Sequence, residues 1–286
     1  MTEANKTSLI NFFTKRGRRD ILIFFVGYSI FITLFLLTMI EVIDIFILCF
    51  MILIFSIVQS CLGVGLLLFG TPTLIIFGYS YSETLWMILP SSIVISLAQV
   101  IFDRDLIQSK KSIFLLTVPT LTVGLIIILW SGDLVNISKI VGLGLLIVAF
   151  IRQSKVLNTY LSNLISKRSS VYLLGVGLIH GLSNMGGGPL SILMSSLHKS
   201  ESSIRVNIAY VYLFFGISQI IILTILESEA FDVNYFVFPV VAITSYFFIG
   251  KPLSNYIDDN KYQSFITIMV FIYGFLALID VNTYIN

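Results

Sequence analysis

Charged residues are scarce in this chain of 286 residues, where Asp, Glu, Lys and Arg together make up 11% of the sequence. A soluble globular domain carries about 25%, so the scarcity of charge excludes that class. The 24 Phe and 13 Tyr residues exclude a disordered chain, because so much aromatic surface must be buried. A net charge of +2 leaves no clustered basic face for a nucleic acid. The composition is that of a polytopic membrane protein.

Several chemistries are also missing. Cys49 and Cys61 form no C-x-x-C pair and are too few for a disulfide framework or a zinc site. No G-x-x-x-x-G-K-[ST] loop is present to bind ATP phosphates, and no acidic residue lies mid-span to relay protons. His180 and Ser183 have no orienting acid beside them. We therefore expect no enzyme activity, no catalytic residue, no cofactor and no metal.

Long apolar stretches do occur, and about 20 such residues cross a bilayer as a helix. The stretch 21–40 follows the basic run 15–19 and lacks a small-residue cleavage site, so we interpret it as a retained helix. The other single spans are predicted at 84–102, 112–130, 139–151, 204–226, 234–249 and 262–281.

Two further apolar stretches, 45–78 and 171–198, do not fit single crossings. Each is interrupted by residues that break helices, such as Gly63, Gly65 and Pro72 in the first. We interpret both as hairpins of two helical arms that meet at a break within the membrane. Irregular backbone at that depth is tolerated only when protein or a water-filled cavity covers it, so the breaks are the candidate functional region.

The distribution of positive charge predicts the topology, because Lys and Arg concentrate in cytoplasmic loops. If the N-terminus is cytoplasmic and each hairpin returns to its starting side, 16 of the 17 Lys and Arg residues fall inside and only Lys139 outside. The loop 227–232 is acidic and falls outside. We expect a multi-pass protein of the plasma membrane, with its C-terminus outside.

This topology contains an internal repeat. We divide the chain into a cytoplasmic N-terminus with an extra transmembrane helix, a first repeat, a cytoplasmic loop and a second repeat, at 1–44, 45–151, 152–170 and 171–286. Each repeat is a broken hairpin followed by three transmembrane helices, and the two have opposite orientations. The register is open: Gly65 and Gly186 differ by 121 positions, but Pro72 and Pro189 by 117. The expected fold is an all-α membrane protein of two inverted repeats, the layout of secondary transporters.

The breaks suggest how a ligand could bind. The run Gly186–Pro189 predicts a helix start with Pro189 at the first position. A helix that begins inside the membrane directs unpaired N–H groups at an anion. The corresponding start in the first hairpin is Leu66 or Thr73, depending on the register. Gln59 and Gln99 are further polar wall residues. The substrate-binding candidates are Ser60, Gly63, Gly65, Ser91, Ser92, Ser183, Asn184, Gly186, Gly187, Gly188, Asn207 and Gln219.

Structural roles compete with these assignments. The pair Gly177 and Gly181 is typical of close helix packing. Ser91, Ser92, Gln99 and Gln219 could equally form hydrogen bonds between helices. His180 is either a packed, hydrogen-bonded residue or the group that couples transport to protons.

The two breaks resemble the sulfite exporter TauE/SafE family of membrane transporters, whose repeats carry a G-x-G-G-G segment. The matching residues are Gly63-Val64-Gly65 with Pro72, and Asn184 followed by Met185 and Gly186–Gly188. Arg205 falls where that family carries a basic residue. Leu66, Leu67 and Asn184 depart from the pattern. The resemblance implies transport of sulfur-containing anions, such as sulfite or sulfonates.

We therefore expect a secondary transporter, or permease, that moves a small sulfur-containing anion by alternating access. Its expected partners are this anion and the lipid bilayer, not nucleic acid, and a homo-oligomer is left open. Two alternatives remain at this point: a passive anion channel of the same fold, and a membrane scaffold or assembly factor without transport activity.

Overall fold

The computed structural model describes residues 42–108, 111–131 and 168–256, together with isolated positions at 26, within 143–165 and within 264–275. The spans predicted at 21–40, 139–151 and 262–281 lie largely outside the described residues, as does most of the loop 152–170. The chain divides into two units, Met1–Phe50 and Met51–Asn286. Every contact discussed below lies within the second unit.

All regular elements of the described residues are helical. The bounds are α3 Val42–Leu62, η1 Leu66–Gly70, α4 Thr71–Ile76, α5 Tyr81–Phe102, η2 Arg104–Leu106, α6 Lys111–Ser131, α9 Ser169–Ser183, α10 Gly187–Leu197, α11 Glu201–Leu226, η4 Ser228–Ala230, η5 Val233–Phe236, α12 Val237–Ser245, η6 Tyr246–Gly250 and α13 Lys251–Ser254. Elements η1 and η6 are π-helical, and η2, η4 and η5 are 3₁₀ turns.

Five of these segments are long and apolar enough to cross a membrane, at Asp44–Leu62, Tyr81–Phe102, Ile113–Ser131, Glu201–Leu226 and Val233–Ser254. Four of them match the single spans predicted at 84–102, 112–130, 204–226 and 234–249. The fifth is the first arm of the hairpin predicted at 45–78. The expectation of an all-α, multi-pass membrane protein is thus confirmed.

Serine side chains set where the two helices after the hairpins begin. Ser80 accepts a hydrogen bond from the N–H of Glu83 at 3.2 Å, and the Glu83 carboxylate accepts from the Ser80 N–H at 2.9 Å. This reciprocal pair satisfies two donors that a helix start leaves free. Ser200 caps α11 in a similar way, since its hydroxyl accepts from the N–H of Ser203. Both caps lie 120 positions apart in the sequence.

Both predicted breaks are present. Helix α3 ends at Leu62 and the chain turns through Gly63, whose φ of 76° favours glycine. The second arm begins at Leu66 and continues through Thr71 without interruption, so of the two predicted starts Leu66 is the observed one.

In the second hairpin, α9 ends at Ser183 and Asn184 adopts a left-handed conformation with φ of 59°. Helix α10 then begins at Gly187, which makes Pro189 its third residue. The prediction that Pro189 occupies the first position was wrong by two residues. The proline is still tolerated, because the third N–H of a helix has no intrahelical acceptor.

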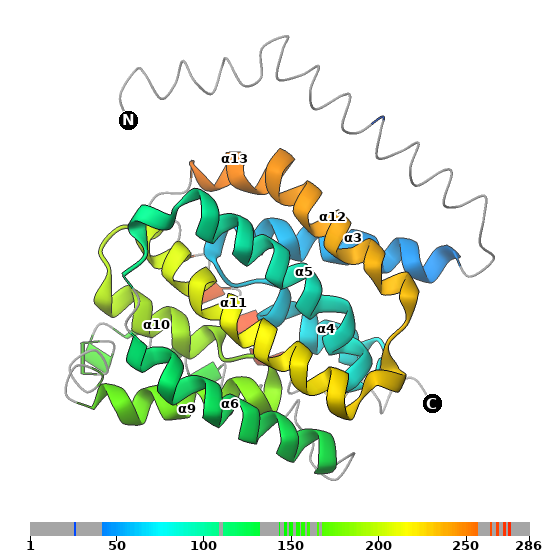
Figure 1. The fold of residues 1–286 in the computed structure, drawn as a ribbon. Coiled ribbons are helices and arrows are strands. Elements are labelled where there is room, and N and C mark those ends of the chain that lie inside the picture. Colours follow the sequence, from blue (N-terminus) through cyan, green and yellow to red (C-terminus); the bar gives the residue numbers. More distant parts are fainter. Residues whose placement is uncertain are drawn as a thin grey trace. The chain divides into compact units, whose positions relative to one another are not determined.

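The second hairpin packs closely on α6. A Cβ on Gly177 would collide with Thr117 and Thr120, and one on Gly181 would collide with Leu121. These glycines let the backbones of α9 and α6 approach each other, so their predicted packing role is confirmed. Figure 1 shows α6 beside α9, and α11 beside α5.

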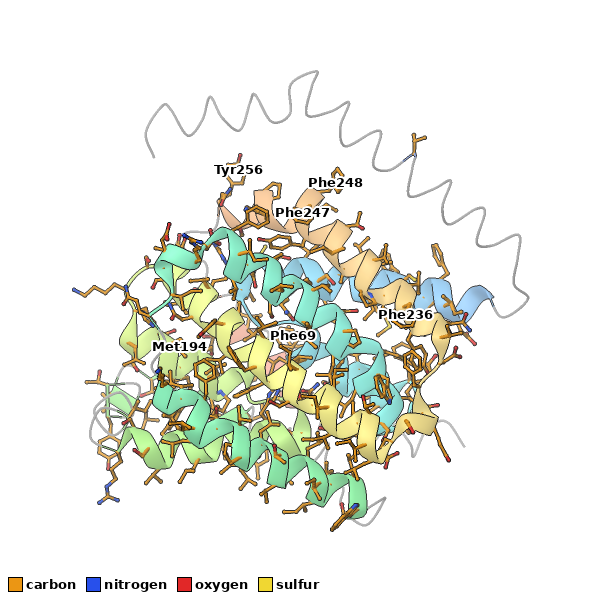
Figure 2. The ribbon with its side chains drawn as sticks, in the orientation of Figure 1. Phe69, Met194, Phe236, Phe247, Phe248 and Tyr256 are labelled. Carbon is orange, nitrogen blue, oxygen red and sulfur yellow. The ribbon has the colours of Figure 1, made fainter. Side chains whose placement is uncertain are left out.

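Apolar side chains also cover much of the outer surface of the second unit. Phe236, Phe247 and Phe248 are 65%, 45% and 43% exposed, whereas Phe69 and Met194 are fully buried (Figure 2). An aromatic surface of this kind is stable against lipid and unstable in water. The fold therefore surrounds an interior, built around the two breaks, with a lipid-compatible exterior.

Candidate functional site

The breaks of the two hairpins contact each other. A Cβ placed on Gly187 would lie 3.1 Å from Cγ1 of Val64, which belongs to the first break. One turn further along the first hairpin, the hydroxyl of Thr71 accepts a hydrogen bond of 2.9 Å from the side-chain amide of Asn184. Residues more than 110 positions apart in the sequence thus form one buried polar region.

Asn184 is the centre of the second break. Its amide nitrogen donates to Thr71, and its carbonyl oxygen accepts from the Gln219 amide at 3.2 Å. The side chains of Asn184 and Gln219 are fully buried. The left-handed backbone and these two bonds hold the turn between α9 and α10 in place, with α11 as its wall.

Several polar atoms around this turn make no hydrogen bond of ordinary length and angle. They are both ring nitrogens of His180, the Tyr212 hydroxyl and Oε1 of Gln219. The side-chain amide of Gln219 is a polar neighbour of the His180 ring, which also packs against Phe215 at 4.6 Å between ring centroids. Burying a polar group without a partner costs free energy, so this cluster is suited to a ligand that supplies the missing bonds.

The start of α10 adds backbone donors to the cluster. Among the described residues, the N–H groups of Gly187 and Gly188 have no acceptor, as expected for the first turn of a helix. The Tyr212 hydroxyl lies directly against Gly187, since a Cβ there would overlap it. Helix starts carry a partial positive charge. The second break therefore offers N–H and O–H donors in a buried place where the described residues include no acidic side chain.

The helix start at the first break is capped by a side chain instead, although Oε1 of Gln99 nearby also has no partner. Oε1 of Gln59 accepts from the N–H of Leu66, the first residue of η1, at 3.2 Å. The Gln59 amide nitrogen donates to the hydroxyls of Ser92 at 2.9 Å and Ser96 at 3.3 Å. The side chain of Gln59 thus occupies the place that an anion would take at this helix start. Gln99 donates to the Ser60 carbonyl at 3.0 Å and joins α5 to the same arm.

Glycines at the first break serve close packing. A Cβ on Gly63 would lie 2.9 Å from the carbonyl oxygen of Arg205 on α11, and one on Gly65 would collide with the backbone of Gln59. The predicted residues Ser60, Gly63, Gly65 and Ser92 therefore lie together, although the structure gives them structural partners.

Three predicted residues lie away from the polar cluster or face their own helix. Asn207 accepts from the N–H of Gln108 at 2.8 Å and donates to the Leu106 carbonyl at 2.9 Å, so it anchors the loop after α5. Ser91 donates to the Met87 carbonyl, and Ser183 donates to the Ile179 carbonyl. Gly188 belongs to the helix start, and Gly186 packs against His180.

Sequence reasoning missed Tyr212 and Thr71. Tyr212 stands seven residues before Gln219, a spacing that places both on one face of a helix, and this could have indicated it. Thr71 lies in an apolar run and carries no comparable indication.

Comparison with known proteins gives one family match. The model of the family described as "Sulfite exporter TauE/SafE" matches residues 48–276 of this chain. No curated protein and no solved structure matches the chain. The matched region contains both breaks and every residue of the polar cluster.

Proposed function

The chain belongs to the sulfite exporter TauE/SafE family, which makes it a membrane transporter of the sulfite or anion type, and from this premise we propose that it is a secondary transporter. It moves a small sulfur-containing anion, such as sulfite or a sulfonate, across the plasma membrane by alternating access. The site is the second break, where Gly187 and Gly188 present backbone N–H groups. The Tyr212 hydroxyl and the polar groups of His180 and Gln219 complete it.

One observation carries this proposal: the two breaks differ in how their helix starts are satisfied. At the first break the side chain of Gln59 accepts from the first N–H of the helix start, that of Leu66, whereas at the second break no side chain of the described residues accepts from Gly187 or Gly188. His180 lies 121 positions after Gln59 and is its counterpart in the repeat, but it accepts no such bond. An oxyanion at the second break would accept the bonds that Gln59 accepts at the first.

The energetics favour an anion at this place. A hydrogen bond to a charged group contributes about 1.5–3 kcal/mol, roughly twice a neutral one. Two N–H donors and one O–H donor therefore contribute about 4.5–9 kcal/mol, and the cost of association, at least about 4 kcal/mol, leaves a weak affinity. A substrate held this weakly is released quickly, as a transporter requires.

Two inverted repeats supply the movement in this proposal. A shift of 120 or 121 positions relates the caps Ser80 and Ser200, the turn residues Gly65 and Gly186, and the wall residues Gln99 and Gln219. Rocking of one repeat against the other around the contact between the breaks would expose the anion to each side in turn. The proposed orientation keeps the N-terminus in the cytoplasm and the C-terminus outside.

Proton coupling through His180 is a separate part of the proposal. The ring is fully buried, so a proton reaches it only when the transport cycle opens the site. We expect the His180→Asn variant to transport sulfite with a flatter dependence on pH than the wild type. An unchanged pH profile would remove His180 from the coupling step and leave the anion site intact.

A thermal-shift screen of the detergent-purified chain tests the binding function. The probes are sulfite, thiosulfate, sulfate, methanesulfonate and, as matched controls, acetate and bicarbonate. A ligand that binds only the folded state stabilises it by about 2.7 kcal/mol at 100 times its Kd. We expect stabilisation by a sulfur anion and little effect of carboxylates. Stabilisation by none of the anions contradicts the proposal and favours a scaffold.

A flux measurement separates a transporter from a channel of the same fold. In proteoliposomes, alternating access predicts sulfite uptake that saturates with concentration and accelerates when unlabelled sulfite is present on the opposite side. A passive channel shows neither property, because its flux follows the electrochemical gradient alone.

A further inference from the structure

Arg205 is the only charged side chain that is buried among the described residues, with an exposed fraction of 5%. It lies in the second turn of α11, inside the segment Glu201–Leu226 that is long and apolar enough to span a membrane. A charged group in such a segment is expensive and is retained for pairing or for function. The question is therefore what compensates the charge of Arg205.

The structure gives the Arg205 guanidinium little compensation. Its Nη1 lies 3.5 Å from the carbonyl oxygen of Ser254, a long hydrogen bond, although a guanidinium carries five N–H donors. Among the described residues, no carboxylate comes within 4.0 Å of it, and the one ion pair joins Arg104 to Asp105. Asp103 acts electrostatically on the neighbouring Tyr246 but forms no ion pair with Arg205.

The surroundings of Arg205 attract negative charge. Helix α13, which contributes the Ser254 carbonyl, begins with Lys251, whose ammonium group lies 3.5 Å from the ring centroid of Phe102. Two positive side chains thus stand at the same end of the unit. The electrostatic neighbours of Arg205 are the Cys61 thiol and the Tyr246 hydroxyl. Arg205 and Lys251 outweigh the one carboxylate that acts on the same Tyr246, that of Asp103, and a net positive potential concentrates anions.

The place of Arg205 on α11 connects it with the second break. Arg205, Tyr212 and Gln219 follow one another at intervals of seven residues, which places them on one face of the helix. Seven residues advance a helix by about 10 Å. The backbone of Arg205 also packs against Gly63, a residue of the first break. Arg205 therefore lies about two turns before Tyr212 on the same helix.

We propose that Arg205 forms a second anion-binding position, which takes the same class of oxyanion as the second break and is filled together with it. This inference rests on the proposed function. The planar guanidinium donates two parallel hydrogen bonds to two oxygens of one sulfite or sulfate ion. Arg205 supplies the full positive charge that the second break lacks, and so selects anions over neutral molecules.

Binding stoichiometry tests the second position. The full chain, purified in a chloride-free gluconate buffer, is titrated with radiolabelled sulfite in equilibrium dialysis. We expect two ions per chain for the wild type and one for Arg205→Met, whose side chain has a similar length but no charge. Arg104→Gln is the matched control, because it removes an arginine whose side chain is 80% exposed. It is expected to bind two ions with unchanged affinity.

Affinity and stability provide the second readout. We expect Arg205→Met to raise the dissociation constant of the tighter sulfite site at least tenfold. Arg205→Lys should raise it less. Without anions, Arg205→Met should unfold at the same temperature as the wild type or higher, because an unpaired buried charge has been removed. A residue with only a structural role would show the opposite stability effect.

The outcomes separate this inference from the proposed function. If Arg205→Met still binds two sulfite ions with wild-type affinity, the second position is wrong. It is also wrong if Arg205→Met fails to fold without anions while Arg205→Lys folds, since the charge is then structural. If Gly187→Leu keeps two ions while Arg205→Met loses one, the site at the second break fails and the Arg205 position stands. A wild type that binds no sulfite contradicts both.

Discussion

The contact between Gly187 and Tyr212 predicts that Gly187→Ala destabilises the fold and that Tyr212→Phe restores most of the lost stability. In the Gly187→Ala variant the new methyl group overlaps the Tyr212 hydroxyl, because a Cβ at this position falls within van der Waals contact of that oxygen. The tyrosine cannot move away easily. Its ring is fully buried and packs beside His180 and Phe215, with centroid distances of 5.5 and 6.3 Å. Adding a methyl group to such a packed place costs about 1–3 kcal/mol.

Removing the hydroxyl should relieve most of this cost. In Gly187→Ala with Tyr212→Phe, the nearest atoms to the methyl group are Cγ1 of Val64 at 3.1 Å and Cζ of the ring at 3.2 Å, which small adjustments can accommodate. The Tyr212→Phe variant alone should fold as stably as the wild type or better, because its hydroxyl has no partner to lose. A double-mutant cycle of these two substitutions should therefore show a coupling free energy of about 1–2 kcal/mol that favours the double variant.

The assay is unfolding of the purified protein in an SDS titration, with the fluorescence of Trp86 and Trp130 as the signal. Sulfite binding is measured on the same four proteins. In the proposed site Tyr212→Phe removes a donor to the anion, so we expect the dissociation constant of sulfite to rise about 10-fold or more, from 1.5 kcal/mol per charged hydrogen bond. The reasoning is refuted if the stability effects of the two substitutions add within about 0.5 kcal/mol.

Three further predictions concern the scaffold of the site. Gly177→Ala should destabilise the fold by about 1–3 kcal/mol through its collision with α6, whereas Gly175→Ala in the same helix, with open space around its Cβ, should be neutral or stabilising in the same SDS titration. Asn184→Gly should cost about 1–2 kcal/mol of stability, because two hydrogen bonds are lost. Asn184→Ala should cost more, since alanine disfavours the left-handed backbone at this position. Equal stabilities of the two variants would contradict this. Asn207→Ala should speed tryptic cleavage after Arg104 while sulfite affinity stays unchanged, and a loss of affinity would return Asn207 to the site.

The helices and their breaks could be predicted from the sequence because their causes are local. Apolar runs of about 20 residues locate spans, and glycines followed by proline locate breaks. The start of α10 was misplaced because a proline is tolerated at any of the first helical positions with a free N–H, not only the first. Pro189 alone therefore could not decide between them.

The identity of the polar partners depends on tertiary contacts and could not be predicted. Nothing near Gln59 in the sequence indicates that it caps Leu66, or that Ser92 and Ser96 satisfy its amide. The same holds for Asn207, whose partners are backbone groups about 100 residues away. Amide and hydroxyl side chains can serve a ligand or another helix equally well. Only the three-dimensional arrangement separates the capped break from the open one.

The central claim is that the open break in the second hairpin is the anion site of a transporter. Counterflow of radiolabelled sulfite in proteoliposomes tests it most directly, with wild type, Gly187→Leu and the control Gly175→Leu reconstituted in equal amounts. We expect saturable counterflow for the wild type and the control, and at least a tenfold loss for Gly187→Leu. Wild-type counterflow by Gly187→Leu would show that the anion does not bind at the second break.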